Sequence, residues 1–143
     1  MPDTPILVSA CLAGIRCRYN GEVESFEPVV DLVRRGRAVP FCPEVFGGLP
    51  TPRAPCEIRD GRVVDADGAD RTAEFRRGAG EGLALAKLMS CREAVLKARS
   101  PSCGSGEVYD GTFTATRVAG DGFFARLLKE HGISVRTEED LEG

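Results

Sequence analysis

Three cysteines occupy the same kind of position in the sequence. Cys11 follows the apolar run ILVSA, Cys42 follows AVPF, and Cys103 follows EAVLKA after a short loop with serine and proline. Each run is typical of a short buried strand that ends in a loop. Thiolates without histidine partners favour zinc, copper(I) or an iron–sulfur cluster. The three side chains are therefore candidates for one metal site.

The other potential ligands have weaker support. We expect Cys91, at the end of a helix, to pack in the core, and Cys56, in a proline-rich loop, to be structural or incidental. Cys17 lies close to Cys11, which leaves ligation or a redox role open. The single histidine, His131, precedes a glycine and is typical of a solvent-facing helix cap. A histidine-rich zinc site is thereby excluded, and a structural zinc site would need closer cysteine spacing.

The composition bounds the class of protein. The chain has 143 residues, 42% of them hydrophobic and 29% charged, with a net charge of −3. Six cysteines are many for a chain whose start has neither a signal-peptide pattern nor a membrane span, so we expect a cytoplasmic protein with reduced thiols. The acidic balance gives no basic surface for strong nucleic-acid binding. We expect a small-molecule substrate, no membrane association, and a homodimer as a candidate assembly.

The apolar spacing predicts alternating strands and helices. Strands are expected at 6–10, 38–41, 93–98 and 133–135, and helices at 24–36, 70–89 and 120–132. A small β-hairpin is expected around Asp60-Gly61, beside the main sheet. This order predicts one α/β domain over 1–143, Rossmann-like, with an open, mostly parallel sheet of about four strands flanked by helices.

Three glycines fall inside the expected helix at 70–89. Glycine weakens a helix in isolation. Gly78, Gly80 and Gly82 therefore predict close packing of this helix against the sheet. Asp70 is the expected N-cap of the same helix.

Such a sheet would bring the three cysteines together. In an open parallel sheet, ligands bind outside the carboxyl ends of the strands, where the strand order reverses. Neighbouring strands lie about 4.8 Å apart, so thiolates at adjacent strand ends can converge on one compact group. Backbone N–H groups of the glycine-containing loops would hydrogen-bond its sulfurs. Three ligands would leave one metal position open for a substrate.

The motifs around these cysteines resemble those of a known family. The chain is similar to the TudS-like thiouracil desulfurases in VSACLAGIRCRYNG (8–21), FCPEVFGGLPTPR (41–53), KARSPSCG (97–104), YDGTF (109–113) and GDG (120–122). The resemblance implies a [4Fe-4S] cluster held by Cys11, Cys42 and Cys103, with one iron free to take sulfur from a thiolated pyrimidine. It also implies an acid/base role for Glu44 and a substrate-positioning hydroxyl on Ser100.

The implied reaction is a non-redox desulfuration. The open iron would act as a Lewis acid on the thiocarbonyl group of 2- or 4-thiouracil, or of a thiouridine, and water would attack the ring carbon. Glu44, partly desolvated, would move the protons, and Ser100 would hydrogen-bond the pyrimidine edge. The product is uracil or uridine, and the sulfur leaves as sulfide.

Six further residues are expected around the substrate and the cluster. Arg18, Arg53 and Lys97 would neutralise the cluster's charge or bind a substrate phosphate. The remaining members of this set are Ser9, Ser102 and Gly104.

Other functions stay open from the residues alone. The same three cysteines could serve a non-catalytic sulfur carrier or metal-binding module. A structural zinc protein would use them without catalysis. A redox thiol enzyme is the weakest alternative, because the chain has no C-x-x-C motif.

Overall fold

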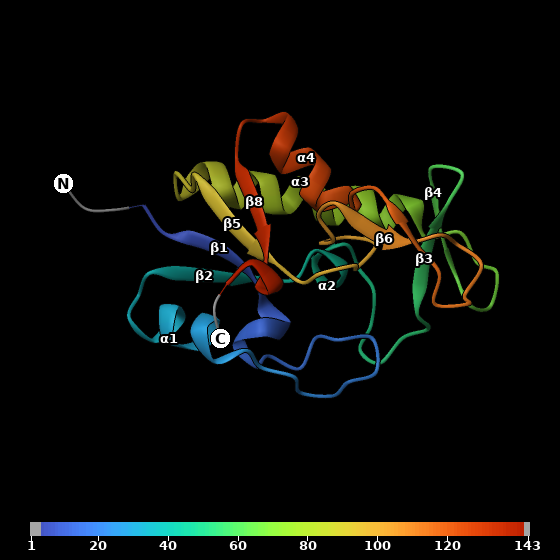
Figure 1. The fold of residues 1–143 in the computed structure, drawn as a ribbon, viewed down its shortest axis with the longest axis horizontal. Coiled ribbons are helices and arrows are strands. Elements are labelled where there is room, and N and C mark those ends of the chain that lie inside the picture. Colours follow the sequence, from blue (N-terminus) through green and yellow to red (C-terminus); the bar gives the residue numbers. More distant parts are fainter. Residues whose placement is uncertain (1–3, 142–143) are drawn as a thin grey trace.

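A parallel sheet of four strands forms the centre of the computed structural model, which describes residues 4–141 (Figure 1). The strands are β1 (Ile6–Ser9), β2 (Ala38–Phe41), β5 (Glu93–Leu96) and β8 (Ser134–Thr137), in the order β2-β1-β5-β8. All three neighbouring pairs are parallel, which confirms the expected α/β class. The chain passes from β1 to β2 on one side and then to β5 on the other. The strand order therefore reverses between β1 and β5.

The two central strands are apolar except at Ser9 and Glu93, because both of their faces are covered. Leu7 of β1 and Leu96 of β5 pack on one face with α3 (Thr72–Leu88) and α4 (Phe123–Glu130). Val8 and Val95 point to the opposite face and pack against α1 (Glu27–Arg34). Helices thus lie on both sides of the sheet (Figure 1).

The three expected helices are present, and each begins later than the sequence predicted. The helix α3 begins at Thr72 rather than Asp70. The Asp70 carboxylate accepts the backbone N–H of Thr72 at 2.8 Å. Asp70 therefore does satisfy a donor at the start of this helix, as a capping residue does.

A fourth helix, α2 (Pro43–Phe46), was not predicted, and it explains one of the glycines of α3. A Cβ atom at Gly78 would overlap the backbone of Pro43, so α2 rests directly on α3. A Cβ at Gly82 would overlap side chains that include Phe124 of α4. Close packing is confirmed at these two glycines, although Gly78 faces α2 rather than the sheet. The prediction of close packing is wrong for Gly80, where a Cβ would meet no described atom within 4 Å.

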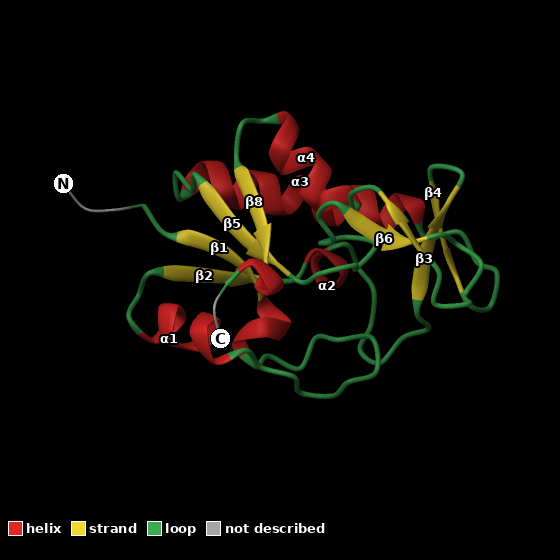
Figure 2. Cartoon of the chain, viewed as in Figure 1, coloured by secondary structure: helices red, strands yellow, loops and turns green. Residues whose placement is uncertain are grey.

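Two hairpins lie beside the main sheet (Figure 2). The expected hairpin pairs β3 (Cys56–Arg59) with β4 (Arg62–Asp65), and its turn residues Asp60 and Gly61 both have positive φ, at 50° and 76°. A second hairpin, of β6 (Glu107–Tyr109) and β7 (Arg117–Ala119), was not predicted.

Two 3-10 turns follow strands of the main sheet. The first, η1 (Ala10–Ala13), comes directly after β1, and η2 (Glu138–Asp140) comes directly after β8. Both lie at the carboxyl edge of the sheet. Within residues 4–141, none of the helices is long and apolar enough to cross a membrane.

Candidate active site

The carboxyl ends of β1, β2 and β5 open into a cavity of about 340 Å³. Ten of the site residues predicted from the sequence line this cavity: Ser9, Cys11, Arg18, Cys42, Glu44, Arg53, Lys97, Ser100, Ser102 and Cys103. Gly104 is not among the described lining residues. Its N–H donates to the carbonyl oxygen of Ser100 at 2.8 Å, so it shapes the turn behind the cavity.

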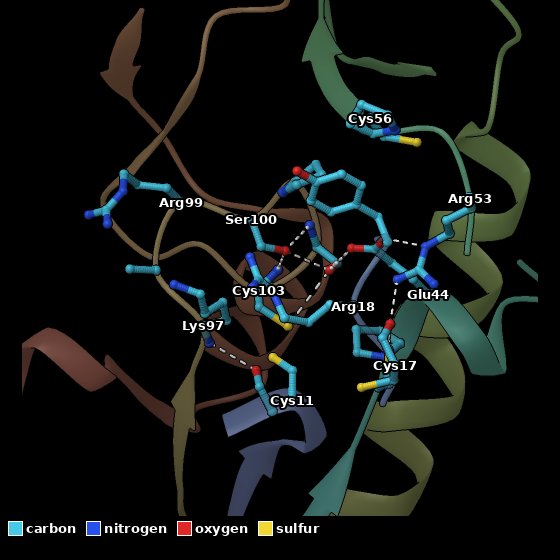
Figure 3. Close-up of a pocket in the computed structure, with 18 of the residues that line it drawn as sticks. Cys11, Cys17, Arg18, Glu44, Arg53, Cys56, Lys97, Arg99, Ser100 and Cys103 are labelled. Atoms are coloured by element: carbon cyan, nitrogen blue, oxygen red, sulfur yellow. Dashed lines mark hydrogen bonds and ion pairs between the residues drawn. The ribbon is translucent and has the colours of Figure 1, made fainter. Parts of the chain in front are cut away.

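Three cysteines form what we call the sulfur wall of the cavity: Cys11, Cys42 and Cys103. Cys11 lies in η1, directly after β1, and Cys42 precedes the first residue of α2, directly after β2. Cys103 follows β5 and is 4% exposed. Figure 3 shows the sulfur atoms of Cys11 and Cys103 facing the same space. The strand ends therefore bring together three thiols that are remote in the sequence.

A fourth thiol, that of Cys17, lies against the sulfur wall and is buried. It hydrogen-bonds with the thiols of both Cys11 and Cys42. These hydrogen bonds lower the pKa of Cys11, and they lower the pKa of Cys42 to about 7. The pKa of Cys17 is raised, because its proton is held between two sulfurs. Two of the three sulfur-wall residues are thus disposed to be thiolates, the form that binds metals.

The third sulfur-wall residue has a different environment. Burial raises the pKa of Cys103, and a hydrogen bond with Ser9 partly offsets this effect. The hydroxyl of Ser9 also accepts the backbone N–H of Lys97 at 2.9 Å. Ser9 thereby joins the end of β1 to the segment that leads to Cys103.

Beside the thiols lies what we call the oxygen wall: Glu44, Ser100 and Ser102, with Arg53 bonded to Glu44. The Nε of Arg53 pairs with Oε1 of Glu44 at 3.1 Å, and the two side chains are only 7% and 14% exposed. The Nη2 of Arg53 donates to the carbonyl oxygen of Cys17 at 2.8 Å. Its Nη1 donates to the Pro50 carbonyl and to the Thr51 hydroxyl, each at 3.1 Å.

This arrangement commits the Arg53 guanidinium to protein groups. It fixes Glu44 and at the same time ties the loop that carries Cys17 to the loop at 50–53. Holding a substrate phosphate, as the sequence suggested, would require Arg53 to give up these hydrogen bonds. The geometry supports a role in orienting Glu44.

The two serines of the oxygen wall bond with each other and with Glu44. The hydroxyl of Ser102 donates to Oε2 of Glu44 at 2.8 Å, and the hydroxyls of Ser100 and Ser102 are 2.9 Å apart. The Oγ of Ser100 accepts the backbone N–H groups of Ser102 and Cys103, at 3.1 and 3.0 Å. Ser100 therefore also shapes the turn that carries Cys103.

The remaining cations of the cavity are paired with carboxylates. Arg18 bonds with Glu24 at 2.6 Å. Lys97 bonds with Oε2 of Glu138 at 2.9 Å. Each of these two cations is already paired with a carboxylate, so a bound anion would compete with that carboxylate.

A further pair of contacts closes the same side of the cavity. Oε1 of Glu138 accepts the backbone N–H of Ala98 at 2.7 Å, and Arg99 pairs with Glu139 at 2.8 Å. The turn η2 thus clasps the segment between β5 and Cys103. Arg99 lines the cavity and was not predicted as a site residue.

Two tyrosines also line the cavity and were not predicted as site residues. Tyr19 reaches it from the loop after η1, and Tyr109 reaches it from β6. Both lie within sequence motifs quoted above, CRYNG and YDGTF, so the motifs contained the signal. Cys56, expected to be structural or incidental, lines the cavity as well, and burial raises its pKa to about 12.

The thiols are not grouped around a single ion-sized point. Among the described residues, no group of three or more histidine, cysteine, aspartate or glutamate side chains could hold one metal ion. A cluster of several metal atoms makes a different demand, because each thiolate binds a separate metal atom. The three thiols of the sulfur wall suit a cluster of several metal atoms rather than a single metal ion.

Three comparisons relate the chain to known proteins. A family model described as 2-thiouracil desulfurase matches residues 6–140. The chain is 44% identical over 146 residues to the uncharacterized protein YbbK of Bacillus subtilis (strain 168), with 95% of this chain and 97% of that protein covered. It is 47% identical to a solved structure described as the [4Fe-4S]-dependent thiouracil desulfidase TudS, with a TM-score of 0.93. That match covers 97% of this chain and 93% of the other.

Proposed function

This chain belongs to the 2-thiouracil desulfurase family, and from that premise we propose that it is a [4Fe-4S]-dependent enzyme that removes sulfur from thiolated pyrimidines. The substrates would be 2- or 4-thiouracil, or the corresponding thiouridines, and the products uracil or uridine with sulfide. One observation carries the proposal: three thiols and a hydrogen-bonded carboxylate line one cavity.

The sulfur wall fits the proposed cofactor by its donor chemistry. Cys11, Cys42 and Cys103 would each bind one iron, and the lowered pKa of Cys11 and of Cys42 favours the thiolate form that binds iron. The hydroxyl group of Ser9 lies near Cys103 and would hydrogen-bond its sulfur. When bound, the cluster supplies a Lewis-acidic iron that polarises the thiocarbonyl group.

Glu44 is the proposed acid/base residue. The paired Arg53 keeps its carboxylate in place at the edge of the cavity, and Ser102 donates a hydrogen bond to its other oxygen. A carboxylate held in this way can take a proton from water as the water attacks the ring carbon, and can return it to the leaving group. The net change is a thiocarbonyl and water to a carbonyl and hydrogen sulfide, with no electron transfer.

The cavity also offers aromatic contacts to the proposed substrate class. Tyr19 and Tyr109 present aromatic side chains to it, and aromatic rings favour stacking on a planar pyrimidine. We propose that these rings, together with Ser100, orient the substrate.

Anaerobic reconstitution with iron and sulfide tests the proposed function. The protein should turn brown, bind the iron of one cluster per chain, and release uracil and sulfide in equal amounts from 2- or 4-thiouracil. Labelled water should place its oxygen in the uracil. A brown protein that releases no uracil would instead be the sulfur carrier or metal-binding module, and a colourless protein with zinc would exclude both.

Location and assembly remain predictions from the sequence. Fractionation of cells would test the cytoplasmic location. Light scattering of the reconstituted protein would test the homodimer.

A further inference from the structure

The cavity is lined by a second carboxylate, Glu57 of β3, in addition to Glu44. Glu44 is paired with Arg53, whereas Glu57 forms no ion pair with any described residue. The Oε1 of Glu57 accepts the backbone N–H groups of Gly111 and Phe113, at 3.0 and 3.1 Å. These two donors occupy both lone pairs of Oε1. Within residues 4–141, the other oxygen, Oε2, has no hydrogen-bond partner.

The loop that holds Glu57 is itself fixed against β3. Gly111 has a φ of 91°, and a Cβ atom there would lie only 2.7 Å from the carbonyl oxygen of Ile58. A residue with a side chain would not fit so close to the strand. The Nε of Arg59 donates to the carbonyl oxygen of Gly111 at 2.9 Å. The Glu57 carboxylate is therefore held in one orientation by the loop after β6.

The free oxygen of Glu57 is accessible from the cavity. Among the side chains that the structure describes, every buried nitrogen or oxygen has a hydrogen-bond partner. The unpartnered Oε2 is therefore not buried, and Glu57 lines the cavity. An oriented carboxylate oxygen with two free lone pairs is a hydrogen-bond acceptor for donor groups of a ligand.

Glu57 lies at the end of the cavity that is remote from the thiols. Figure 3 shows its chain neighbour Cys56 at one end of the site and the sulfur atoms of Cys11 and Cys103 at the other. A substrate with its thiocarbonyl sulfur at the thiols would extend past Glu44 toward Glu57. In 4-thiouridine the sugar is attached to N1, which lies across the ring from C4. The ribose is then the part of the substrate that points away from the sulfur.

We propose that Oε2 of Glu57 binds the ribose hydroxyl groups of a thiolated ribonucleoside and thereby selects ribose over 2′-deoxyribose. The inference rests on the proposed desulfurase function. A carboxylate has the same task in dinucleotide-binding folds, where it hydrogen-bonds the ribose 2′-hydroxyl. The two lone pairs of Oε2 match the two neighbouring hydroxyls of ribose. Glu57 is thus a specificity-determining residue and takes no part in the chemical step.

Other parts of such a substrate suit this oxygen less well. A phosphate would be repelled by a carboxylate that has no paired cation. The ring N3–H is next to C4, the reacting carbon of 4-thiouridine, and therefore lies beside Glu44 rather than Glu57. The sugar hydroxyls are the donors that remain at the far end.

Steady-state kinetics of the reconstituted enzyme with 4-thiouridine and 4-thio-2′-deoxyuridine tests the assignment. For the unsubstituted enzyme, kcat/KM should be about tenfold higher with the ribonucleoside, the effect of one hydrogen bond to a charged group. Glu57→Gln keeps one oxygen for the two backbone N–H groups and replaces the other by an amide nitrogen. The ratio of the two kcat/KM values should then fall to about one, chiefly through a higher KM for 4-thiouridine. No such loss is expected with 4-thiouracil, which has no sugar.

Arg59→Ala is the matched control for a purely structural role of Glu57. It removes another contact between β3 and Gly111 and leaves the Glu57 carboxylate unchanged. A loosened loop would affect all three substrates alike, so the ratio between the two nucleosides should stay about tenfold. A ratio that falls as far in Arg59→Ala as in Glu57→Gln would overturn the assignment, because anchoring of the loop would then explain both.

Calorimetry with the products gives a readout that requires no turnover. Uridine should bind the reconstituted protein about tenfold more tightly than 2′-deoxyuridine, and Glu57→Gln should remove the difference. Equal affinities of the unsubstituted protein for the two nucleosides would contradict the proposed contact.

These outcomes are distinct from failure of the proposed function. If the reconstituted protein releases no sulfide from any of the three substrates, the function itself is wrong. If it releases sulfide and treats the two nucleosides alike, only the assignment of Glu57 is wrong.

Discussion

The sulfur wall and the oxygen wall of the cavity are built by different means. Each thiol of the sulfur wall follows its own strand, and the parallel sheet alone brings the strand ends together. The oxygen wall depends on side-chain contacts between segments remote in the chain, such as the bond from Ser102 to Glu44, 58 residues apart. The first wall takes its geometry mainly from the sheet, with the Ser100 hydroxyl bonded to the turn that carries Cys103, and the second takes it from side-chain hydrogen bonds. Changes in the oxygen wall should therefore impair catalysis while the sulfur wall still binds its cofactor.

Removal of a sulfur-wall thiol should have the largest effect. Cys103→Ser should lose most of its iron and, with the cofactor, nearly all of its activity. Substitution of a residue that only contacts a metal ligand already costs about 10- to 100-fold. Iron analysis after anaerobic reconstitution measures this. The control is Cys91→Ala, a buried thiol of the core packed among apolar side chains, which should keep its iron. If Cys17→Ser loses as much iron as Cys103→Ser, the assignment of three ligands is wrong.

Substitution in the oxygen wall should separate cofactor binding from turnover. Glu44→Gln keeps the size of the side chain and removes its ability to take a proton. It should retain the brown colour and lose roughly 10²- to 10⁴-fold in kcat. Absorption spectra and uracil release measure the two properties on one sample. A colourless Glu44→Gln would show that the two walls depend on each other.

A matched pair of glycine substitutions in α3 should disturb both walls together. Gly78→Ala places a methyl group against Pro43 and should push α2 away, displacing the adjacent Cys42 and Glu44. We expect a loss of about 1–3 kcal/mol in the free energy of unfolding, with weaker iron binding and lower kcat. Gly80→Ala meets open space, and should stabilise the protein by up to about 1 kcal/mol. Urea unfolding gives both values, and equal effects of the two substitutions would contradict the proposed contact.

The smallest effect should appear among the thiols of the chain without a cluster. The pKa of Cys42 is lowered to about 7 and the pKa of Cys56 is raised to about 12. The thiolate fraction of Cys42 should rise about tenfold between pH 6 and pH 8, and its alkylation rate with it. Mass spectrometry after brief iodoacetamide treatment would follow both sites. Cys17→Ala removes the main cause of the lowered pKa, so alkylation of Cys42 should then require higher pH. Equal alkylation of Cys42 and Cys56 at pH 7 would count against this account.

The central sheet could be predicted from the sequence, whereas the smaller elements could not. The strands β1 and β5 each contain three consecutive apolar residues because both faces of the sheet are covered, and this pattern is visible without a structure. The hairpin of β6 and β7 has strands of only three residues, and all of β7 is exposed, so no apolar alternation marks it. The helix α2 has only four residues and starts at Pro43, close after a strand, where a proline is typical of a strand end rather than of a helix.

The same difference applies to the site. The grouping of Cys11, Cys42 and Cys103 could be predicted from the sequence, because the end of each strand can be located separately. The clamp of Arg53 on Glu44 and Cys17 was not, since it requires knowing how α2 rests on α3. The roles of Glu44 and Ser100 came from the resemblance, and their hydrogen bonds came from the structure.

The clasp formed by η2 gives the protein an order of assembly. Lys97 and Arg99 are made about 40 residues before the carboxylates of Glu138 and Glu139 that pair with them. A ribosome adds roughly 5–20 residues each second, so the segment that carries Cys103 exists for seconds before these partners do. The cavity can therefore reach its final shape only after the last of these acidic residues has been translated.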